Sequence, residues 1–391
     1  MSAQSDAGAP YVLKAKQLFD DSDFVAHPVV LVEAGKVRAV GSDIPDTVVT
    51  HDLGQATLLP GLVDCHQHLV FDGNGTLEGQ VAGRTDDELR SRARTAATTA
   101  LLGGVTTLRD LGDRNYVTLG LRGDPELPTI LCSGPPITLV DGHCWYLGGE
   151  CEGRDDLIAA VRERITSECD VIKIMVSGGF STPGTPMWRS QFGVDDVRLV
   201  VDEARAAGVA VAAHCHGVRA ISDAIEAGVN TIEHCSFLNE SLQVAPDVEL
   251  LRRLAASTTA VSATAGLTPG AVLPDLLAGL MSDVIDALSR VHALGGRIVV
   301  GTDAGVEPFK PHDVARYAIH DLLSIGMDPI EALQAMTING ADALGLPRKG
   351  RITPGADADL IAVDGDPAVE PAALSRIVQV WRAGEPLRRA G

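Results

Sequence analysis

The chain lacks long apolar runs, clusters of basic residues and paired cysteines. No apolar run approaches the roughly 20 residues that a membrane-spanning helix needs. Residues 1–10 have neither the charged nor the apolar region of a secretory signal. Seven cysteines, an odd number without paired spacing, favour reduced thiols over a disulfide framework. We therefore expect a soluble cytoplasmic protein that has no membrane partner.

The charge balance is strongly acidic. Thirty-two basic residues oppose 52 acidic ones, for a net charge of −20, and no stretch gathers basic side chains. Proteins that bind the phosphate backbone present such basic clusters. We therefore exclude nucleic acid and anionic membrane surfaces as partners, and expect a small-molecule substrate instead.

Strand-like and helix-like segments alternate through most of the chain. Apolar helical stripes are expected over Thr85–Leu102, Arg154–Glu168, Val194–Ala207, Val218–Ala227 and Asp283–Leu294. Strands are expected near 61–68, 105–111, 129–134, 170–176, 209–216, 230–236, 258–265 and 297–303. Eight strands alternating with helices predict an α/β fold, a (β/α)8 TIM barrel.

The two ends of the chain have a different pattern. Short strands such as Val29–Glu33 and Val37–Val40 precede the barrel, and Ala358–Val363 and Ile377–Arg382 follow it. We expect the late strands to pair with the early ones in a small discontinuous β-sandwich. The predicted domains are residues 1–57 with 346–391 for the sandwich, and 58–345 for the barrel.

Several predicted barrel strands end in a side chain that can bind a metal. His66 and His68 stand two apart in Leu59-Pro-Gly-Leu-Val-Asp-Cys-His-Gln-His68, so they share one face of a strand. Lys173 stands inside an apolar run, in a chain that has only six lysines, and a buried unpaired ammonium is costly. Three further strands end in His214, His234 and Asp303. Because all strands of such a barrel open at one mouth, these side chains predict a shared metal site.

Cysteines adjoin three of these positions. Cys65, Cys215 and Cys235 each follow or precede a proposed ligand, and strand alternation turns them to the opposite face. We expect them to be small buried core residues rather than thiolate ligands.

The order His66-x-His68, Lys173, His214, His234, Asp303 resembles the amidohydrolase superfamily over almost the whole chain. The segments Asp170–Gly179, His214–Gly217, Thr231–Cys235 and Gly355–Leu360 resemble its imidazolonepropionase-related, prolidase-like branch. That branch contains Xaa-Pro and Xaa-Arg dipeptidases, N-acyl amino acid hydrolases and ochratoxin-type amidases. The resemblance implies two metal ions, usually zinc, bridged by a carbamylated lysine and a hydroxide, and relatives often form homo-oligomers.

The residue types support the same chemistry. His66, His68 and Asp303 would hold one ion, and His214 and His234 the second, because imidazole and carboxylate suit zinc. An ammonium at Lys173 would repel two dications, whereas a neutral amine can take up carbon dioxide and become a bridging carbamate. Two ions lower the pKa of a shared water. Asp303 would accept the hydroxide's proton and return it to the leaving amine, in an N-acyl amino acid, a dipeptide or a related amide.

Two more histidines are candidates for the substrate site. His143 lies in Asp141-Gly-His-Cys144, which resembles a turn that relatives place beside the substrate carbonyl, and His216 follows His214 by two residues. We expect one of them to stabilise the oxyanion or hold a substrate carboxylate; the alternative is a histidine that orients a ligand. Arg189, Arg219 and Lys310 lie near expected strand ends and could bind an anionic substrate terminus, but they are interpreted as surface charges.

Two other functions remain open. A deaminase or a cyclic-imide or imidazolone hydrolase of the same superfamily would use one metal and no bridging lysine. Such enzymes usually carry a glutamate shortly after the strand-five histidine, whereas His214-Cys-His-Gly-Val-Arg219 has no carboxylate. A non-catalytic scaffold would not need its ligands, and here all ligand types are present.

Overall fold

The computed structural model describes residues 9–41 and 48–387, and eight of the strands in these ranges form a barrel. In neighbour order the strands are β8 (Leu62–Gln67), β9 (Val105–Asp110), β10 (Thr129–Cys132), β13 (Val171–Met175), β14 (Ala210–Gly217), β15 (Thr231–Leu238), β16 (Ala260–Thr264) and β17 (Ile298–Gly301). Every pair within the two runs β8–β10 and β13–β17 is parallel. The predicted (β/α)8 barrel is confirmed, and all eight strands lie where the sequence places them.

Backbone hydrogen bonds join the two runs of strands at both seams. Between β10 and β13, the amide of Asp170 donates to the carbonyl of Cys132. Between β17 and β8, the amides of Thr302 and Asp303 both donate to the carbonyl of His66. The chain thus closes on itself beside two of the candidate ligands.

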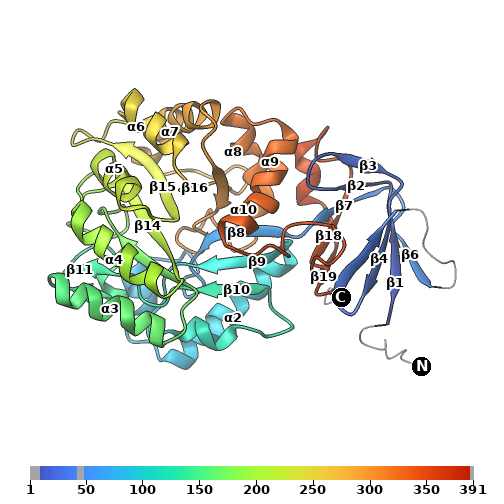
Figure 1. The fold of residues 1–391 in the computed structure, drawn as a ribbon, viewed down its shortest axis with the longest axis horizontal. Coiled ribbons are helices and arrows are strands. Elements are labelled where there is room, and N and C mark those ends of the chain that lie inside the picture. The colour runs from blue at the N-terminus through green and yellow to red at the C-terminus, as the bar shows by residue number, and fades with distance from the viewer. Residues whose placement is uncertain (1–8, 42–47, 388–391) are drawn as a thin grey trace.

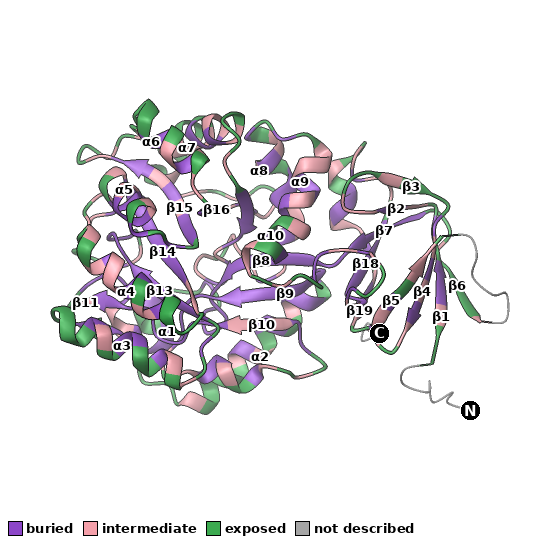
Figure 2. Cartoon of the chain, in the orientation of Figure 1, coloured by how far each residue is buried: buried purple, intermediate pink, exposed green. Residues whose placement is uncertain are grey.

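Helices cover the outside of the ring of strands, with buried faces towards the strands and exposed faces outward (Figure 2). The helices in the described ranges are α1 (Leu77–Val81), α2 (Asp86–Leu102), α3 (Arg154–Thr166), α4 (Val194–Ala206), α5 (Val218–Ala227), α6 (Val248–Ala256), α7 (Asp275–Ala293), α8 (Ala318–Ser324), α9 (Pro329–Ala335) and α10 (Ile338–Ala343). Short 3-10 turns span Val117–Leu121, Trp145–Leu147, Val314–Tyr317 and Pro371–Ser375. The start predicted for the helix Asp283–Leu294 was wrong. This helix, α7, begins at Asp275, and the proline just before it, Pro274, is compatible with the start of a helix.

The small domain is a sandwich of two sheets built from both ends of the chain (Figure 1). One sheet has the order β5 (Lys36–Val40), β4 (Val29–Glu33), β1 (Tyr11–Lys14) and β6 (Val49–Asp52). The other has the order β20 (Glu385–Pro386), β19 (Ile377–Arg382), β18 (Leu360–Asp364), β7 (Ala56–Pro60), β2 (Gln17–Phe19) and β3 (Phe24–Ala26). β18 pairs antiparallel with β7, which confirms the predicted pairing of late with early strands.

The sandwich has a core of its own, formed by Leu13, Val30, Leu58, Leu360 and Trp381 among others. β7 pairs with β18 through Pro60, and β8 starts at Leu62. Gly61 is the residue between them, and a Cβ there would meet the Thr106 side chain at 2.1 Å. The domain limits proposed from the sequence stay a prediction. Residues 1–8, most of the segment in which no secretory signal was found, lie outside the described ranges.

Two strands, β11 (Thr138–Leu139) and β12 (Glu150–Cys151), pair in the loop after β10 and bring His143 over the barrel mouth. None of the helices in the described ranges combines the length and apolar character that crossing a bilayer requires.

Candidate metal centre and active site

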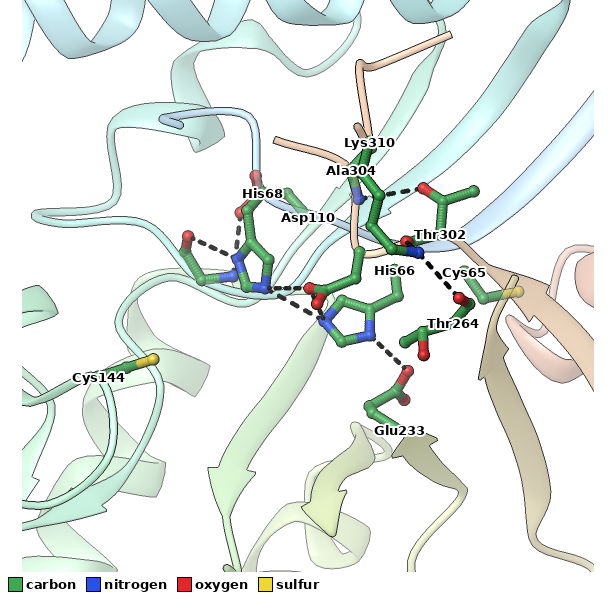
Figure 3. Close-up of polar contacts among 12 residues, drawn as sticks. Cys65, His66, His68, Asp110, Cys144, Glu233, Thr264, Thr302, Ala304 and Lys310 are labelled. Carbon is green, nitrogen blue, oxygen red and sulfur yellow. Dashed lines mark hydrogen bonds and ion pairs between the residues drawn. The ribbon is translucent and has the colours of Figure 1, made fainter. Parts of the chain in front are cut away.

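The first cluster of ligand-type side chains joins β8 to the end of β17. The Nε2 atoms of His66 and His68 lie 3.2 Å apart, and each lies 3.3 Å from Oδ1 of Asp303. Figure 3 shows the rings of His66 and His68 turned towards each other. Three ligand atoms at such distances can share one divalent cation.

Local backbone geometry aims Asp303 at the histidines. The residue is left-handed, with φ +59°, which side chains other than glycine adopt at a cost of about 1–3 kcal/mol. Gly301 just before it packs against β8, because a Cβ there would meet the Cβ of His66 at 2.6 Å. The buried Asp64 carboxylate accepts hydrogen bonds from the amide and hydroxyl of Thr302 at 2.9 and 2.7 Å. These contacts fix β17 against β8 at the cluster.

The second cluster comes from β14 and β15. His214, His216 and His234 each offer a ring nitrogen, and these nitrogens lie within 4.8 Å of one another. The rings of His216 and His234 stack with centroids 4.5 Å apart. His234 is also left-handed, with φ +69°. The structure therefore places His216 with the two predicted ligands, at a position that sequence analysis assigned to substrate binding.

Hydrogen bonds occupy one nitrogen on two of these rings. His214 Nε2 lies 3.1 Å from the carbonyl oxygen of Gly178, and His216 Nδ1 lies 2.9 Å from the hydroxyl of Ser236. Each ring then has its other nitrogen free of these bonds, as a metal-binding imidazole requires.

Lys173 is the buried lysine that the sequence predicts. Its side chain is fully buried in β13, and Nζ has no hydrogen-bond partner among the described residues. Burial lowers the pKa of Lys173, although the charges of Glu233 and Asp303 raise it. An unpaired buried ammonium is expensive, so this amine is suited to the neutral form.

Burial also keeps the imidazoles neutral. It lowers the pKa of His66 to about 4, with the Lys173 charge as the next cause, and the pKa of His216 to about 4. Burial and the neighbouring histidines hold the pKa of His214 and His234 well below the usual range. Neutral rings have the lone pairs that metal ligation needs.

His143 reaches the same place from the loop between β11 and β12. Its Nδ1 lies 2.9 Å from the hydroxyl of Thr182, and its ring centroid lies 4.6 Å from that of His214. Burial, then the proximity of His216, lowers its pKa to about 3. Gly179 makes room for it, since a Cβ there would meet His143 Nε2 at 2.2 Å.

One cavity of about 210 Å³ collects these side chains. Of the eight site residues predicted from the sequence, seven line it: His68, His143, Lys173, His214, His216, His234 and Asp303. His66 lies behind them and reaches the cluster through Nε2. Cys65, Cys215 and Cys235 are buried in the apolar core, as expected, and belong to neither cluster.

Sequence reasoning missed a buried charged pair behind His66. Nδ1 of His66 lies 3.1 Å from Oε2 of Glu233 (Figure 3). The other oxygen of Glu233 accepts a hydrogen bond from Arg109 at 2.9 Å. Burial alone would raise the pKa of Glu233, but the Arg109 guanidinium and His66 hold it far below its usual range. The argument applied to Lys173, a charge inside an apolar strand, would have found both residues.

The surface interpretation of Lys310 was wrong. Its Nζ donates to the carbonyl oxygens of Thr264, Gly266 and Thr302 at 2.9, 3.3 and 2.7 Å, at the edge of the cavity. Arg219 is exposed and pairs with Asp223, and Arg189 is exposed over the Trp188 ring. Of these three residues, only Arg189 and Arg219 are surface charges.

Comparison with known proteins agrees with this site. Residues 57–388 match the amidohydrolase family. Ochratoxinase of Aspergillus niger is 27% identical, over 100% of this chain and 89% of that protein. An imidazolonepropionase of Salinispora tropica is 26% identical, over 92% and 89% of the two chains.

A solved structure shares the fold. A Xaa-Pro dipeptidase with methionine bound in its active site superposes with a TM-score of 0.84, at 24% identity, over 97% of this chain and 100% of that one. The family match covers the barrel and the late strands of the sandwich, β18, β19 and β20. The chain therefore belongs to the amidohydrolase family.

Proposed function

We propose that the chain is a binuclear metal-dependent hydrolase of amide bonds. The observation that carries the proposal is the pair of ligand clusters at one cavity, which the unpartnered amine of Lys173 also lines. The relatives named ochratoxinase and Xaa-Pro dipeptidase support an amide substrate such as an N-acyl amino acid or a dipeptide.

The donor set fits two divalent ions, and zinc in particular. Two imidazoles with a carboxylate, and three imidazoles, are ligand types that zinc prefers. Lys173 fits as a bridge if its amine adds carbon dioxide, which forms a carbamate and releases a proton. That reaction would convert the buried, unpartnered amine of Lys173 into an anionic group that can bind the cations.

When bound, two such ions supply an activated water and polarise the substrate carbonyl. Asp303 is placed to move the proton: its carboxylate faces the cavity and contacts both His66 and His68. It would accept the proton of the attacking water and deliver it to the leaving nitrogen.

His143 and His216 are proposed to act on the substrate. His143 is neutral, and Thr182 fixes its ring orientation, so it can donate to a developing oxyanion only through Nε2. His216 has a competing role as a third ligand of the second cluster. The variants His143→Asn and His216→Asn distinguish these roles. A histidine that acts on the substrate can be replaced without loss of metal, whereas replacement of a metal ligand lowers the metal content.

A second candidate is a mononuclear hydrolase or deaminase, favoured by the likeness to imidazolonepropionase. It predicts one bound ion that does not depend on Lys173. The complete ligand set argues against a scaffold without activity. We also propose a cytoplasmic location, supported by seven free, buried cysteines.

The deciding experiment is metal analysis of the purified protein and of Lys173→Ala, each with bicarbonate, together with a screen of N-acyl amino acids and dipeptides. Lys16→Ala, which changes an exposed lysine, is the matched control. The proposal expects two ions in the parent and the control, fewer in Lys173→Ala, and turnover of an amide. One ion in all three proteins would support the mononuclear candidate, and none would contradict both.

A further inference from the structure

The N-terminal part of α7 carries an apolar stripe that the protein buries only in part. Leu277, Leu280, Met281, Val284 and Ile285 are half-buried and line the cavity, together with Leu273 just before the helix and the buried Leu288. The buried residues of this helix are Ala287, Leu288 and Val291, all in its second half. The helix therefore packs on the barrel mainly through its second half.

The direction of the chain explains this arrangement. Each strand of the barrel runs towards the mouth and the following helix runs back, so the N-terminal half of α7 stands at the mouth. With Asp275–Ala293, α7 is longer than α2, the next longest described helix. Its early apolar stripe faces the cavity beside the ligand clusters rather than the barrel wall.

Other parts of the cavity lining are apolar as well. Phe71, Leu77, Met175, Phe180 and Met187 line the same cavity. Its volume of about 210 Å³ exceeds the roughly 150 Å³ of an apolar cavity that takes up a benzene ring. There is room for a group of ring size beside the amide.

Among the described residues that line the cavity, no cationic side chain is free to bind a charged substrate group. Among the described residues that line it, none is an arginine, and Lys173 and Lys310 are the lysines. The three protons of Lys310 point to three backbone carbonyls. Lys173 lies among the ligand clusters.

We infer that the preferred substrate is an amide whose large substituent is uncharged and apolar, an aliphatic chain or an aromatic ring seated against the first half of α7. This inference rests on the proposed function, since the amide must reach the ligand clusters. It makes α7 the element that determines specificity.

The test uses two series of probes with the zinc-loaded enzyme. One series is N-acylglycines from acetyl to octanoyl, and the other is N-acetyl amides of alkylamines and of benzylamine. The inference expects kcat/KM to rise by about fourfold per methylene in one series until the cavity is full. Equal rates along both series, or a preference for the acetyl and methyl members, would overturn it.

Two neighbouring leucines provide matched variants. Leu277 lines the cavity, whereas Leu276 is 37% exposed and does not. Leu277→Asp should lower kcat/KM for the best long probe by at least about tenfold and change the short probe little. Leu276→Asp should leave both unchanged. Equal losses in the two variants would contradict the inference.

A third variant guards against misfolding. Leu277→Phe keeps the helix face apolar but fills space, so the optimum should move to a shorter chain at unchanged metal content; an unmoved optimum would count against the inference.

Calorimetric binding of N-octanoylglycine and N-acetylglycine to metal-free protein separates the two hypotheses. Tighter octanoyl binding without turnover of any amide refutes the proposed function alone, whereas turnover without chain dependence refutes only the apolar site.

Discussion

Glu233 connects the buried charge of Arg109 to the candidate ligand His66, so its removal should affect stability and metal binding separately. Glu233 is fully buried, and Arg109 is 2% exposed. The guanidinium contacts Oε1 of Glu233 at 2.9 Å and also donates to the carbonyl oxygen of Cys65 at 2.7 Å. Oε2 of Glu233 lies 3.1 Å from Nδ1 of His66 and so favours the tautomer with Nε2 directed at the ligand cluster.

Two magnitudes follow from this geometry. Glu233→Ala leaves Arg109 buried without its partner, which costs about 3–5 kcal/mol of unfolding free energy. It also releases the His66 ring, and loss of such an orienting contact weakens metal binding by about 10–100-fold. Replacing the pair together, in Arg109→Leu with Glu233→Leu, removes the unpaired charge and should recover much of the stability. It cannot restore the contact to His66, so metal affinity should stay low.

Urea unfolding of the metal-free proteins measures the first quantity, and zinc titration against a competing chelator measures the second. Glu33→Ala is the control, because the Glu33 side chain is 41% exposed in a surface ion pair with Arg38, and such pairs contribute about 0–1 kcal/mol. Parent-like zinc affinity in Glu233→Ala would refute the positioning role. Recovery of both stability and affinity in the double variant would show that the glutamate acts on metal binding through folding alone.

Two further predictions concern pH and Lys310. The pKa of His66 and of His216 is about 4 in the folded protein and about 6.5 when unfolded, so the unfolded chain binds more protons between these values. The unfolding free energy of metal-free protein should therefore fall as pH falls from about 6.5 to 4, by up to about 1.4 kcal/mol per pH unit for each histidine. Urea titrations should show a smaller slope for His216→Asn and an unchanged slope for the exposed His27→Asn; a flat profile in the parent contradicts the reasoning. Lys310→Met removes a charged donor from three carbonyl oxygens and should cost at least about 3 kcal/mol in urea unfolding. Lys16→Met is its control, and a loss below about 0.5 kcal/mol would show that the three contacts contribute little.

The barrel could be predicted because its signals are local. Apolar runs identify the strands, and five of them precede a predicted helical stripe; the eight predicted strands lie where the structure has them. His66 and His68 could be paired because alternation along β8 needs no knowledge of other strands. The ligands could be assigned to one shared site because parallel barrel strands end at one mouth.

What could not be predicted depends on contacts between distant segments. The sequence before Asp283 contains glycine and two prolines, which indicate a loop. The first turns of α7, from Asp275, were therefore not predicted as helix. Lys310 looks like a surface charge beside Pro311 until the ends of β16 and β17 supply three carbonyls for it. His216 joins its cluster because β14 extends as far as Gly217, a strand end that periodicity does not fix.

The closure of the barrel and the assembly of the first ligand cluster are one structural event. The seam between β17 and β8 is made by the amides of Thr302 and Asp303 on the carbonyl of His66, so the hydrogen bonds that close the ring also set the spacing between ligands. Asp64 strengthens this seam, because its buried carboxylate accepts from Thr302 and from the amide of His66 at 3.2 Å. An ion held by His66, His68 and Asp303 would bridge strands from opposite ends of the barrel sequence. Its binding free energy would then stabilise the closed barrel, so loss of metal should loosen this seam before any other.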